Sequence, residues 1–413
     1  MNSSDIFFKP SGIFGVKTVC CIRFSAKLPA SKFSFGKELR VLMKGATVLK
    51  ESGQIYQDTA NVSPTRSLSI LTFCSCVFFY LLWMASQADA AIVVTGDVDP
   101  TDPATWTSST FGYVGKTGNG EINITGGSEL LNSYGYVGYE SSASGQITVD
   151  GAGSEWNTNA LRISNSGSGT LNITDSGAVN AVADTFVAAN PSSSGMIYFD
   201  NGTLTTRGLF CAADDLGGTG TINANGLVSD VDLVFDATHG LSQTFKINKN
   251  PGQDITVNLD VDGSDSMGVG YRSDGTMRIS DGTVVESKNG YIGYHSGSTG
   301  QVTVNGAGSK WDSHDMHAGH FGNGTLKIEG GGEVDSSHGR IGLNPGSTGH
   351  VTVDGTGSKW SNGSFYVGES GKGTISVTNN GEVISGQSYI GYNSSSTGEA
   401  TVDGAGSIFA RAH

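Results

Sequence analysis

The 413-residue sequence is poor in cysteine, proline and charge. Of its 5 cysteines only Cys211 lies beyond residue 90, so the body of the chain cannot form an internal disulfide and must be stable without cross-links. Proline numbers only 8, and charged residues make up 15% of the chain. Glycine, with 62 residues, is about twice as frequent as usual. It does not recur at every third position, which excludes collagen.

Basic residues are scarce after residue 90. Residues 1–90 contain 10 Lys and Arg against 5 Asp and Glu, whereas residues 91–413 contain 14 against 33, a net charge of −19. An acidic, lysine-poor body is unsuited to phosphate backbones, and we find no basic patch or nucleic-acid motif. We therefore expect no nucleic-acid partner.

One long apolar run lies near the N-terminus. Residues 68–84 are almost wholly apolar, and Ala88 and Ala90 follow with the Ala-x-Ala spacing of a signal-peptidase site. Residues 66–90 therefore predict a secretory signal peptide that is cleaved after Ala90. The alternative is an uncleaved signal anchor, since 17 apolar residues are at the short limit for a bilayer span. Both alternatives place the body outside the cytoplasm and confine membrane contact to this segment.

The body of the chain repeats itself. The marker of the repeat is an apolar residue followed by Gly or another small residue. It occurs at Val114, Val137, Ile163, Val187, Cys211, Val269, Ile292, Ala318, Ile341, Val367 and Ile390. Apart from the gap between Cys211 and Val269, the spacings are 23, 24 or 26 residues, and pairs of 23 and 26 give a 49-residue repeat of two half-units.

Each half-unit contains short strands that alternate between apolar and polar residues. Val302 and Val304 would face one way, for example, and Thr303 the other. A half-unit is too small to bury its own apolar face, but stacked copies bury it against one another. The sequence predicts an all-β fold, a right-handed parallel β-helix (solenoid) of about 24-residue coils paired into 49-residue repeats, preceded by an N-terminal hydrophobic export segment.

The competing architecture is a series of hairpins. Dipeptides suited to type I′ hairpin turns recur at Asp150-Gly151, Asn305-Gly306, Asp354-Gly355 and Asp403-Gly404. The residues that follow, such as "AGSKW", are rich in glycine and do not form a second alternating arm. We therefore interpret these dipeptides as corners between strands, with left-handed backbone at the glycine.

The repeated phrase resembles a known family. "YIG-x₄-GSTG-x-VTV-x-G-x-GS-x-W" followed by "VG-x₄-GTL-x-I-x-GG-x-V" resembles the bacterial repeat proteins associated with type V secretion and PEP-CTERM export, over residues 106–210 and 267–408. The resemblance implies a surface or secreted protein with an autotransporter passenger-like β-helix. The C-terminal sorting tail and the membrane-barrel translocator of such proteins are missing. We therefore expect the sequence to be truncated at its C-terminus.

The expected organisation has five parts. They are an unassigned basic leader at 1–65, with Met43 as an alternative start, an export segment at 66–90, β-helix repeats at 91–210, an irregular β-rich insert or larger coils at 211–266, and truncated β-helix repeats at 267–413.

The β-helix is also a scaffold of pectin-active enzymes, so catalytic motifs were sought. Asp214-Asp215 and His239-Gly240 match parts of a polygalacturonase-like site, but the Asn-Thr-Asp and Arg-x-Lys motifs are absent. His314, His317 and His320 lie within seven residues, yet their spacing does not suit a closed metal site on strands. We expect no enzyme activity, no metal and no cofactor.

Aromatic residues recur at two positions of the repeat. Trp156, Trp311 and Trp360 occupy one corner and are interpreted as packing between coils. The tyrosines beside the glycine column should point outward, where they are candidates for stacking on a glycan; they are Tyr136, Tyr291 and Tyr389.

These observations favour an exported extracellular or cell-surface repeat scaffold, an adhesin-like passenger that is non-catalytic and acts through an extended multivalent surface. The alternative is a secreted polysaccharide-binding or polysaccharide-degrading protein of the pectin-lyase-like kind. The expected partner is an extracellular polysaccharide or the cell-surface matrix. The chain would be secreted or at the cell surface, and membrane-anchored if the N-terminal segment is not cleaved.

Overall fold

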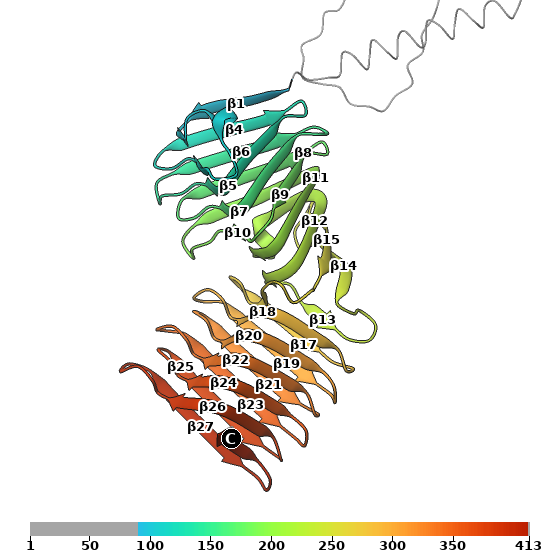
Figure 1. The fold of residues 1–413 in the computed structure, drawn as a ribbon, viewed down its shortest axis with the longest axis vertical. Helices are drawn as coiled ribbons and strands as arrows, with labels where there is room; N and C mark the ends of the chain where they lie inside the picture. Colours follow the sequence, from blue (N-terminus) through green and yellow to red (C-terminus); the bar gives the residue numbers. More distant parts are fainter. Residues whose placement is uncertain (1–89, 412–413) are drawn as a thin grey trace, which may run out of the picture. The chain divides into compact units, whose positions relative to one another are not determined.

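The structure is a computed structural model that describes residues 90–411 as an all-β parallel solenoid of about 12 turns (Figure 1). The prediction of an all-β parallel solenoid is confirmed. Helix is confined, within these residues, to two 3-10 turns, η1 (Pro103–Thr105) and η2 (Ala213–Asp215). The predicted leader and all but the last residue of the predicted export segment lie outside the described residues.

Short strands form the walls of the coils. In the first coils they are β1 (Ala91–Gly96), β2 (Val98–Asp99), β3 (Phe111–Val114), β4 (Asn119–Thr125), β5 (Glu129–Val137), β6 (Ser144–Asp150), β7 (Glu155–Ile163), β8 (Ser168–Thr174), β9 (Ala178–Ala181) and β10 (Thr185–Val187). In the middle they are β11 (Ser194–Cys211), β12 (Leu216–Ser229), β13 (Leu233–Phe235), β14 (Ser242–Ile247), β15 (Asp254–Asp260) and β16 (Met267–Val269). The later strands are β17 (Asp274–Ile279), β18 (Val284–Ile292), β19 (Thr299–Asn305), β20 (Lys310–Ala318), β21 (Asn323–Glu329), β22 (Glu333–Ile341), β23 (Thr348–Asp354), β24 (Lys359–Val367), β25 (Lys372–Thr378), β26 (Glu382–Ile390), β27 (Thr397–Asp403) and β28 (Ile408–Arg411).

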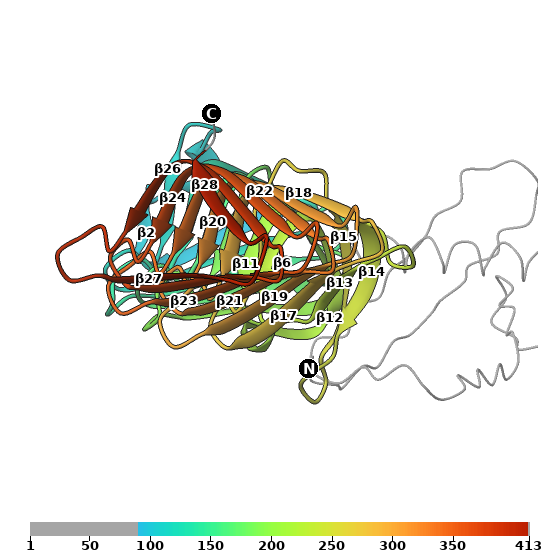
Figure 2. The ribbon, with the colours of Figure 1, turned by 90° about the horizontal axis from the view of Figure 1, so that it is seen from below.

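Equivalent residues of successive coils pair in parallel register. The marker residues of the repeat form two runs of paired partners, Val114–Val137–Ile163–Val187 and Val269–Ile292–Ala318–Ile341–Val367–Ile390. Cys211, Ser229 and Val269 are paired in the same way between the two runs. We call this set the interior column. Figure 2 shows the later strands lying over one another. The column is buried apart from Ile390, which is 50% exposed.

The Gly-Ser-x-Trp corner packs one coil onto the preceding one. Trp311 is fully buried, and its Nε1 donates to Ser287 Oγ of the preceding coil at 3.0 Å. Gly290 of that coil makes room for the indole, because a Cβ there would overlap the ring. The same arrangement recurs for Trp156 with Asn132 and Gly135, and for Trp360 with Ser336 and Gly339.

The repeated Asn/Asp-Gly dipeptides are corners. β19 ends at Asn305 and pairs in parallel with β17 and β21, so it forms no hairpin with the strand that follows. Gly306 has φ +96°, in the left-handed region that favours glycine. Ser309 then accepts a hydrogen bond at Oγ from Gly282 N–H of the preceding coil, at 3.0 Å. The prediction of corners rather than hairpins is therefore confirmed.

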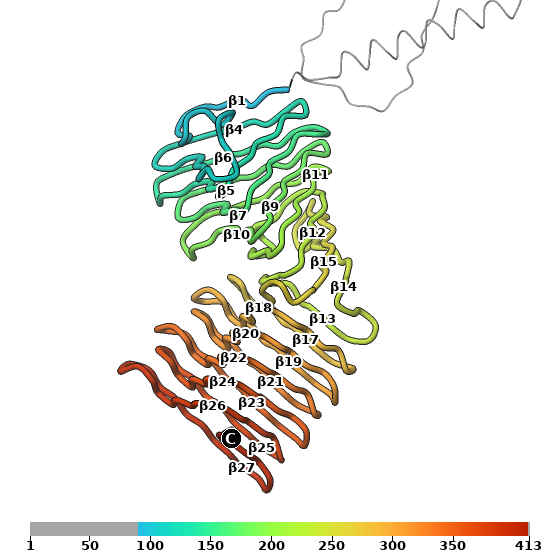
Figure 3. The backbone as a smooth tube through the Cα atoms, viewed as in Figure 1, coloured from blue at the N-terminus to red at the C-terminus, as the bar shows by residue number. Residues whose placement is uncertain are grey.

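Residues 211–266 depart from the regular coil length (Figure 3). Ser229 pairs with Cys211, 18 residues earlier, so this coil is short and lacks a wide corner loop. The next coil runs from Ser229 to Val269 and is larger, because it carries an antiparallel hairpin of β14 and β15. β15 also pairs in parallel with β12, which continues the stack through the insertion.

An antiparallel pairing covers the edge of the first regular coil. β1 runs antiparallel to β4, and β2 runs antiparallel to β3. The Trp106 ring lies against Gly112, and its Nε1 donates to Pro100 O at 3.0 Å. This covering prevents the strand edges of the first coil from pairing with other chains.

Substitution within the interior column should be costly only where neighbouring coils cover it. Ile341→Ala should lower the free energy of unfolding by about 2–5 kcal/mol, because the side chain is fully buried. Ile390→Ala, in the same column but half-exposed, should lower it by about 1 kcal/mol or less. Urea unfolding followed by tryptophan fluorescence measures both, and equal losses would contradict the column.

Candidate functional site

One outward-facing row of side chains follows the coils. It consists of the residue that precedes each member of the interior column, and strand alternation points it away from the core. We call it the aromatic row. Its members, in order along the chain, are Tyr113, Tyr136, Arg162, Phe186, Phe210, Val228, Gly268, Tyr291, His317, Arg340, Tyr366 and Tyr389, each paired in register with the next.

The three tyrosines predicted to contact a glycan all lie in the aromatic row. Tyr136 stacks on Tyr113 with ring centroids 4.9 Å apart, and Tyr389 stacks on Tyr366 at the same distance. Tyr291 stacks on His317 at 5.1 Å. All three are half-buried, because a neighbouring coil covers one ring face. Only the part of each ring that the neighbouring side chains leave uncovered is available to a partner.

A second set of tyrosines widens the row. Tyr139, Tyr294 and Tyr392 each follow the row tyrosine of their own coil by three residues. Each presents its ring edge-on to that tyrosine, with centroids 5.1, 5.0 and 5.1 Å apart. The result is a strip two aromatic rings wide at three separate places along the row.

Cationic side chains are interleaved with the rings. The Arg162 guanidinium lies over the Phe186 ring, 4.6 Å from its centroid, in cation–π geometry. Arg340 instead contacts acids, with Nη1 2.6 Å from Asp315 Oδ1 and Nε 3.2 Å from Glu369 Oε2. Arg162 therefore contacts an aromatic ring of the row, whereas Arg340 contacts acidic side chains.

The three histidines considered as a metal site do not come together. His317 lies in the aromatic row and is buried, and burial lowers its pKa to about 3, helped by the nearby charge of Arg340. Burial also lowers the pKa of His320, whose Nδ1 lies 3.2 Å from Tyr294 O. Both are therefore neutral packing residues at pH 7. His314 is exposed at a corner, away from this pair, and faces His338 instead.

The short coil draws its neighbours together. Tyr271 is fully buried, and its hydroxyl donates to Val187 O at 3.1 Å, although the two residues belong to different coils. Arg272, the next residue, donates to Pro191 O at 3.0 Å. These contacts form because the intervening coil at Cys211 has no wide corner loop to separate the loops on either side.

Two aspartates meet beside the middle of the row. Asp184 and Asp265 approach each other over Gly208, whose missing side chain leaves room for both carboxyl groups. Asp265 is buried and accepts from Arg207 Nε at 2.8 Å. Burial, and then the charge and hydrogen bond of Asp265, raise the pKa of Asp184 to about 7.

This carboxyl pair does not have the geometry of a glycosidase. Retaining enzymes hold their two carboxyl groups about 5–5.5 Å apart and inverting enzymes about 6.5–9.5 Å apart, because a sugar or a water must fit between them. Asp265 is buried, and its Oδ2 accepts from Arg207 Nε at 2.8 Å, so this carboxyl group is not presented to a sugar.

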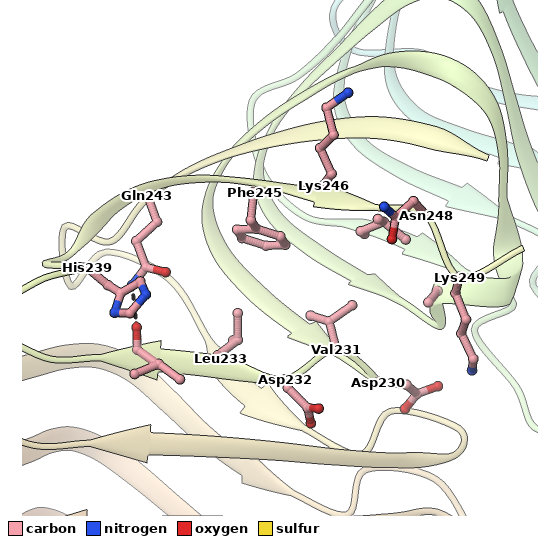
Figure 4. A pocket seen from close by; sticks show the side chains of 13 residues that line it. Asp230, Val231, Asp232, Leu233, His239, Gln243, Phe245, Lys246, Asn248 and Lys249 are labelled. Carbon is pink, nitrogen blue, oxygen red and sulfur yellow. Dashed lines mark hydrogen bonds between the residues drawn. The ribbon is translucent and has the colours of Figure 1, made fainter.

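The larger coil carries a half-open pocket of about 470 Å³ between β13 and β14 (Figure 4). Val231, Leu233 and Phe245 provide apolar walls. Figure 4 shows His239 at one end and Asp230 at the other, so the pocket does not hold them together as an acid–base pair. It offers space for a small ligand and little catalytic chemistry.

The residues that partly matched a polygalacturonase motif are dispersed. Asp214 is exposed, with its Oδ1 3.5 Å from Lys249 Nζ. Asp215 is buried, and burial raises its pKa to about 6 against the hydrogen bond that it accepts from Ala212 N–H. His239 is held by Asp236, with Nδ1 2.8 Å from Oδ1. Each of the three has a structural partner of its own.

The N-terminal predictions fall at the boundary of the described residues. Ala88 lies outside them, whereas Ala90 is exposed and directly precedes β1. None of the described residues belongs to a helix that is long and apolar enough to cross a membrane.

No protein-family model, curated protein or solved structure matches the chain. Function is therefore inferred from the side chains themselves.

The Asp184–Asp265 pair should make stability depend on pH. An unfolded chain ionises Asp184 near pH 4, so between about pH 4 and 7 the folded state binds more protons, and stability falls as the pH rises. Asp184→Asn should raise the free energy of unfolding at pH 8 by about 1–2 kcal/mol. The full shift would be worth about 4 kcal/mol, but the carboxyl group is partly in water.

Urea unfolding of both proteins from pH 4 to pH 8 measures this effect. Glu399→Gln removes an exposed carboxyl group and should leave the pH profile unchanged. A profile for Asp184→Asn as steep as that of the parent would show that the carboxyl pair is not its source.

Proposed function

We propose that the chain is an exported, non-catalytic repeat scaffold, adhesin-like, which presents the aromatic row to an extended extracellular polysaccharide or to the cell-surface matrix. The observation that supports this most strongly is the continuity of the row. Equivalent outward positions on successive coils carry Tyr, Phe, His or Arg in ten of twelve cases. Phe210 and Val228, in the middle of the row, are buried in a second hydrophobic cluster with Tyr271. The tyrosines towards the two ends, such as Tyr136 and Tyr389, remain partly exposed, and packing of the core alone does not require aromatic residues there.

The chemistry of the row suits sugar recognition. Tyrosine combines an apolar ring with a polar tip, so a half-buried tyrosine offers both an apolar edge and a hydroxyl to a sugar. The coils repeat at about 4.8 Å, which places similar contacts at regular intervals. Many weak contacts to one long chain then add up to useful avidity. The net charge of the body, −19, favours a neutral glycan over a polyanionic one.

The finer architecture and the export route form part of the same proposal. The coils would wind right-handed and pair into 49-residue repeats, as in the type V secretion and PEP-CTERM-associated proteins that the repeat resembles. Cleavage after Ala90 is supported by the start of β1 at Ala91 and by the exposure of Ala90. The mature chain would be secreted or held at the cell surface.

A second function is a pectin-lyase-like protein that degrades polysaccharide. The feature in its favour is the Asp184–Asp265 pair, because it does not repeat and the pKa of Asp184 is raised to about 7. The burial of Asp265 and its ion pair with Arg207 argue against hydrolysis by paired acids. Binding without cleavage is the version of polysaccharide recognition that the geometry supports better.

Removal of row tyrosines should weaken glycan binding cumulatively. Tyr136→Ala, Tyr291→Ala and Tyr389→Ala should each weaken retention on a polysaccharide roughly 3- to 10-fold, and the triple variant roughly 100-fold or more. Affinity electrophoresis of the exported chain in gels containing neutral polysaccharides measures this retention.

Tyr198→Ala is the matched control, because Tyr198 is 46% exposed but lies outside the row. Equal retention of the triple variant and the parent would contradict glycan binding through the row. Release of shortened polysaccharide chains by the parent would favour the degrading enzyme instead.

Export should remove the N-terminal segment. The exported chain should begin at Ala91, and Ala88→Arg should block this cleavage because the peptidase site requires small side chains. Intact-mass measurement of the exported protein, with and without the substitution, tests this. A parent chain that keeps residues 66–90 and remains in the membrane fraction would establish the signal anchor.

A further inference from the structure

Three potential metal ligands meet at a corner between two coils. His314 and Asp315 lie on β20, and His338 lies on β22, where it is the register partner of Asp315. His314 Nδ1 is 3.0 Å from Asp315 Oδ2, and His338 Nδ1 is 3.2 Å from Asp315 Oδ1. One ligand atom from each residue lies within 4.8 Å of the other two. It is the one such grouping among residues 90–411.

These separations suit the coordination sphere of a small divalent ion. Zinc binds imidazole nitrogen and carboxylate oxygen at about 2.0–2.2 Å, so two ligand atoms in a tetrahedral site lie roughly 3.3 Å apart. The two nitrogen–oxygen separations in this cluster, 3.0 Å from His314 to Oδ2 and 3.2 Å from His338 to Oδ1, are close to that value. Because they involve the two different oxygens of Asp315, a metal ion held by both histidines would also require the carboxyl group to turn between them.

The contacts around the cluster leave ligand atoms available. Arg340 Nη1 donates to Oδ1, which leaves Oδ2 for an ion, and Glu369 offsets the arginine charge. His338 Nδ1 is buried and makes no hydrogen bond of proper geometry. An ion would give this nitrogen the partner that it lacks.

The cluster belongs to one pair of coils and not to the repeat. In register, the position of Asp315 and His338 is occupied by Asn289, Ser364 and Gln387 in the neighbouring coils. Packing of the solenoid therefore does not require these side chains. His314, with 62% of its side chain exposed, leaves the site open to solvent.

We propose that His314, Asp315 and His338 bind a divalent transition-metal ion, zinc in particular, with an open coordination position for water or an oxygen atom of a partner. The ion would join two adjacent coils. Arg340 of the aromatic row contacts Asp315, so the open position lies beside the row. The proposal does not depend on the proposed function, because metal binding can be measured without any glycan.

Calorimetric titration of the chelator-treated full chain with Zn²⁺ tests the site. The parent should bind one ion per chain, and thermal unfolding should shift upward as zinc is added. His314→Ala and His338→Ala should each weaken binding at least about 100-fold, because even outer partners of metal ligands are worth roughly 10- to 100-fold. His350→Ala is the matched control, since His350 lies on β23 in the other sheet and contacts Thr374.

Two results would overturn the proposal. One is the absence of stoichiometric zinc binding by the parent. The other is parent-like affinity in both His314→Ala and His338→Ala. His314 is largely exposed, so its substitution should leave metal-free thermal unfolding unchanged, and loss of zinc binding in that variant is then not a folding defect.

Discussion

The parallel register between successive coils is the constraint on which the other features depend. Each coil is too short to bury its own aliphatic side chains. Val137, Ile292 and Ile341 are buried because the coil that contains each of them pairs with a neighbouring coil. The same pairing brings Trp311 against Gly290 and its indole N–H to Ser287. A shift by one residue would expose the interior column and bury the aromatic row, so one register fixes both the core and the outward surface.

That surface combines stability with recognition. A row of stacked rings helps to hold the coils together, and tyrosines of the row such as Tyr136 and Tyr389 remain partly exposed to solvent. The proposed glycan contact therefore requires no cleft, which fits a chain whose pocket keeps His239 and Asp230 apart. The proposed metal site adds a single specific position beside a repeated surface. The repeated row would provide avidity, and the cluster at Asp315 would provide metal binding at one position.

The regular, repeating part of the molecule could be predicted from the sequence. Spacing and alternation predicted the interior column, the corners and the alignment of Tyr136, Tyr291 and Tyr389, because each is a local pattern copied from coil to coil. Contacts between different coils that involve non-repeating residues could not be predicted. His338 was not grouped with His314 and Asp315, since the register that joins them spans 23 residues. Tyr271 and the Asp184–Asp265 pair depend on the short coil, whose length no repeat marker indicated.

Paired-cysteine cross-linking tests the coil register most directly. Ser364 and Gln387 are register partners on β24 and β26, and neighbouring strands lie about 4.8 Å apart, within reach of a disulfide. His350 and Lys359 would face each other only if Asp354-Gly355 were a hairpin turn. We predict that Ser364→Cys with Gln387→Cys oxidises readily, whereas His350→Cys with Lys359→Cys does not. The reverse result would contradict the stacked coils and everything inferred from them.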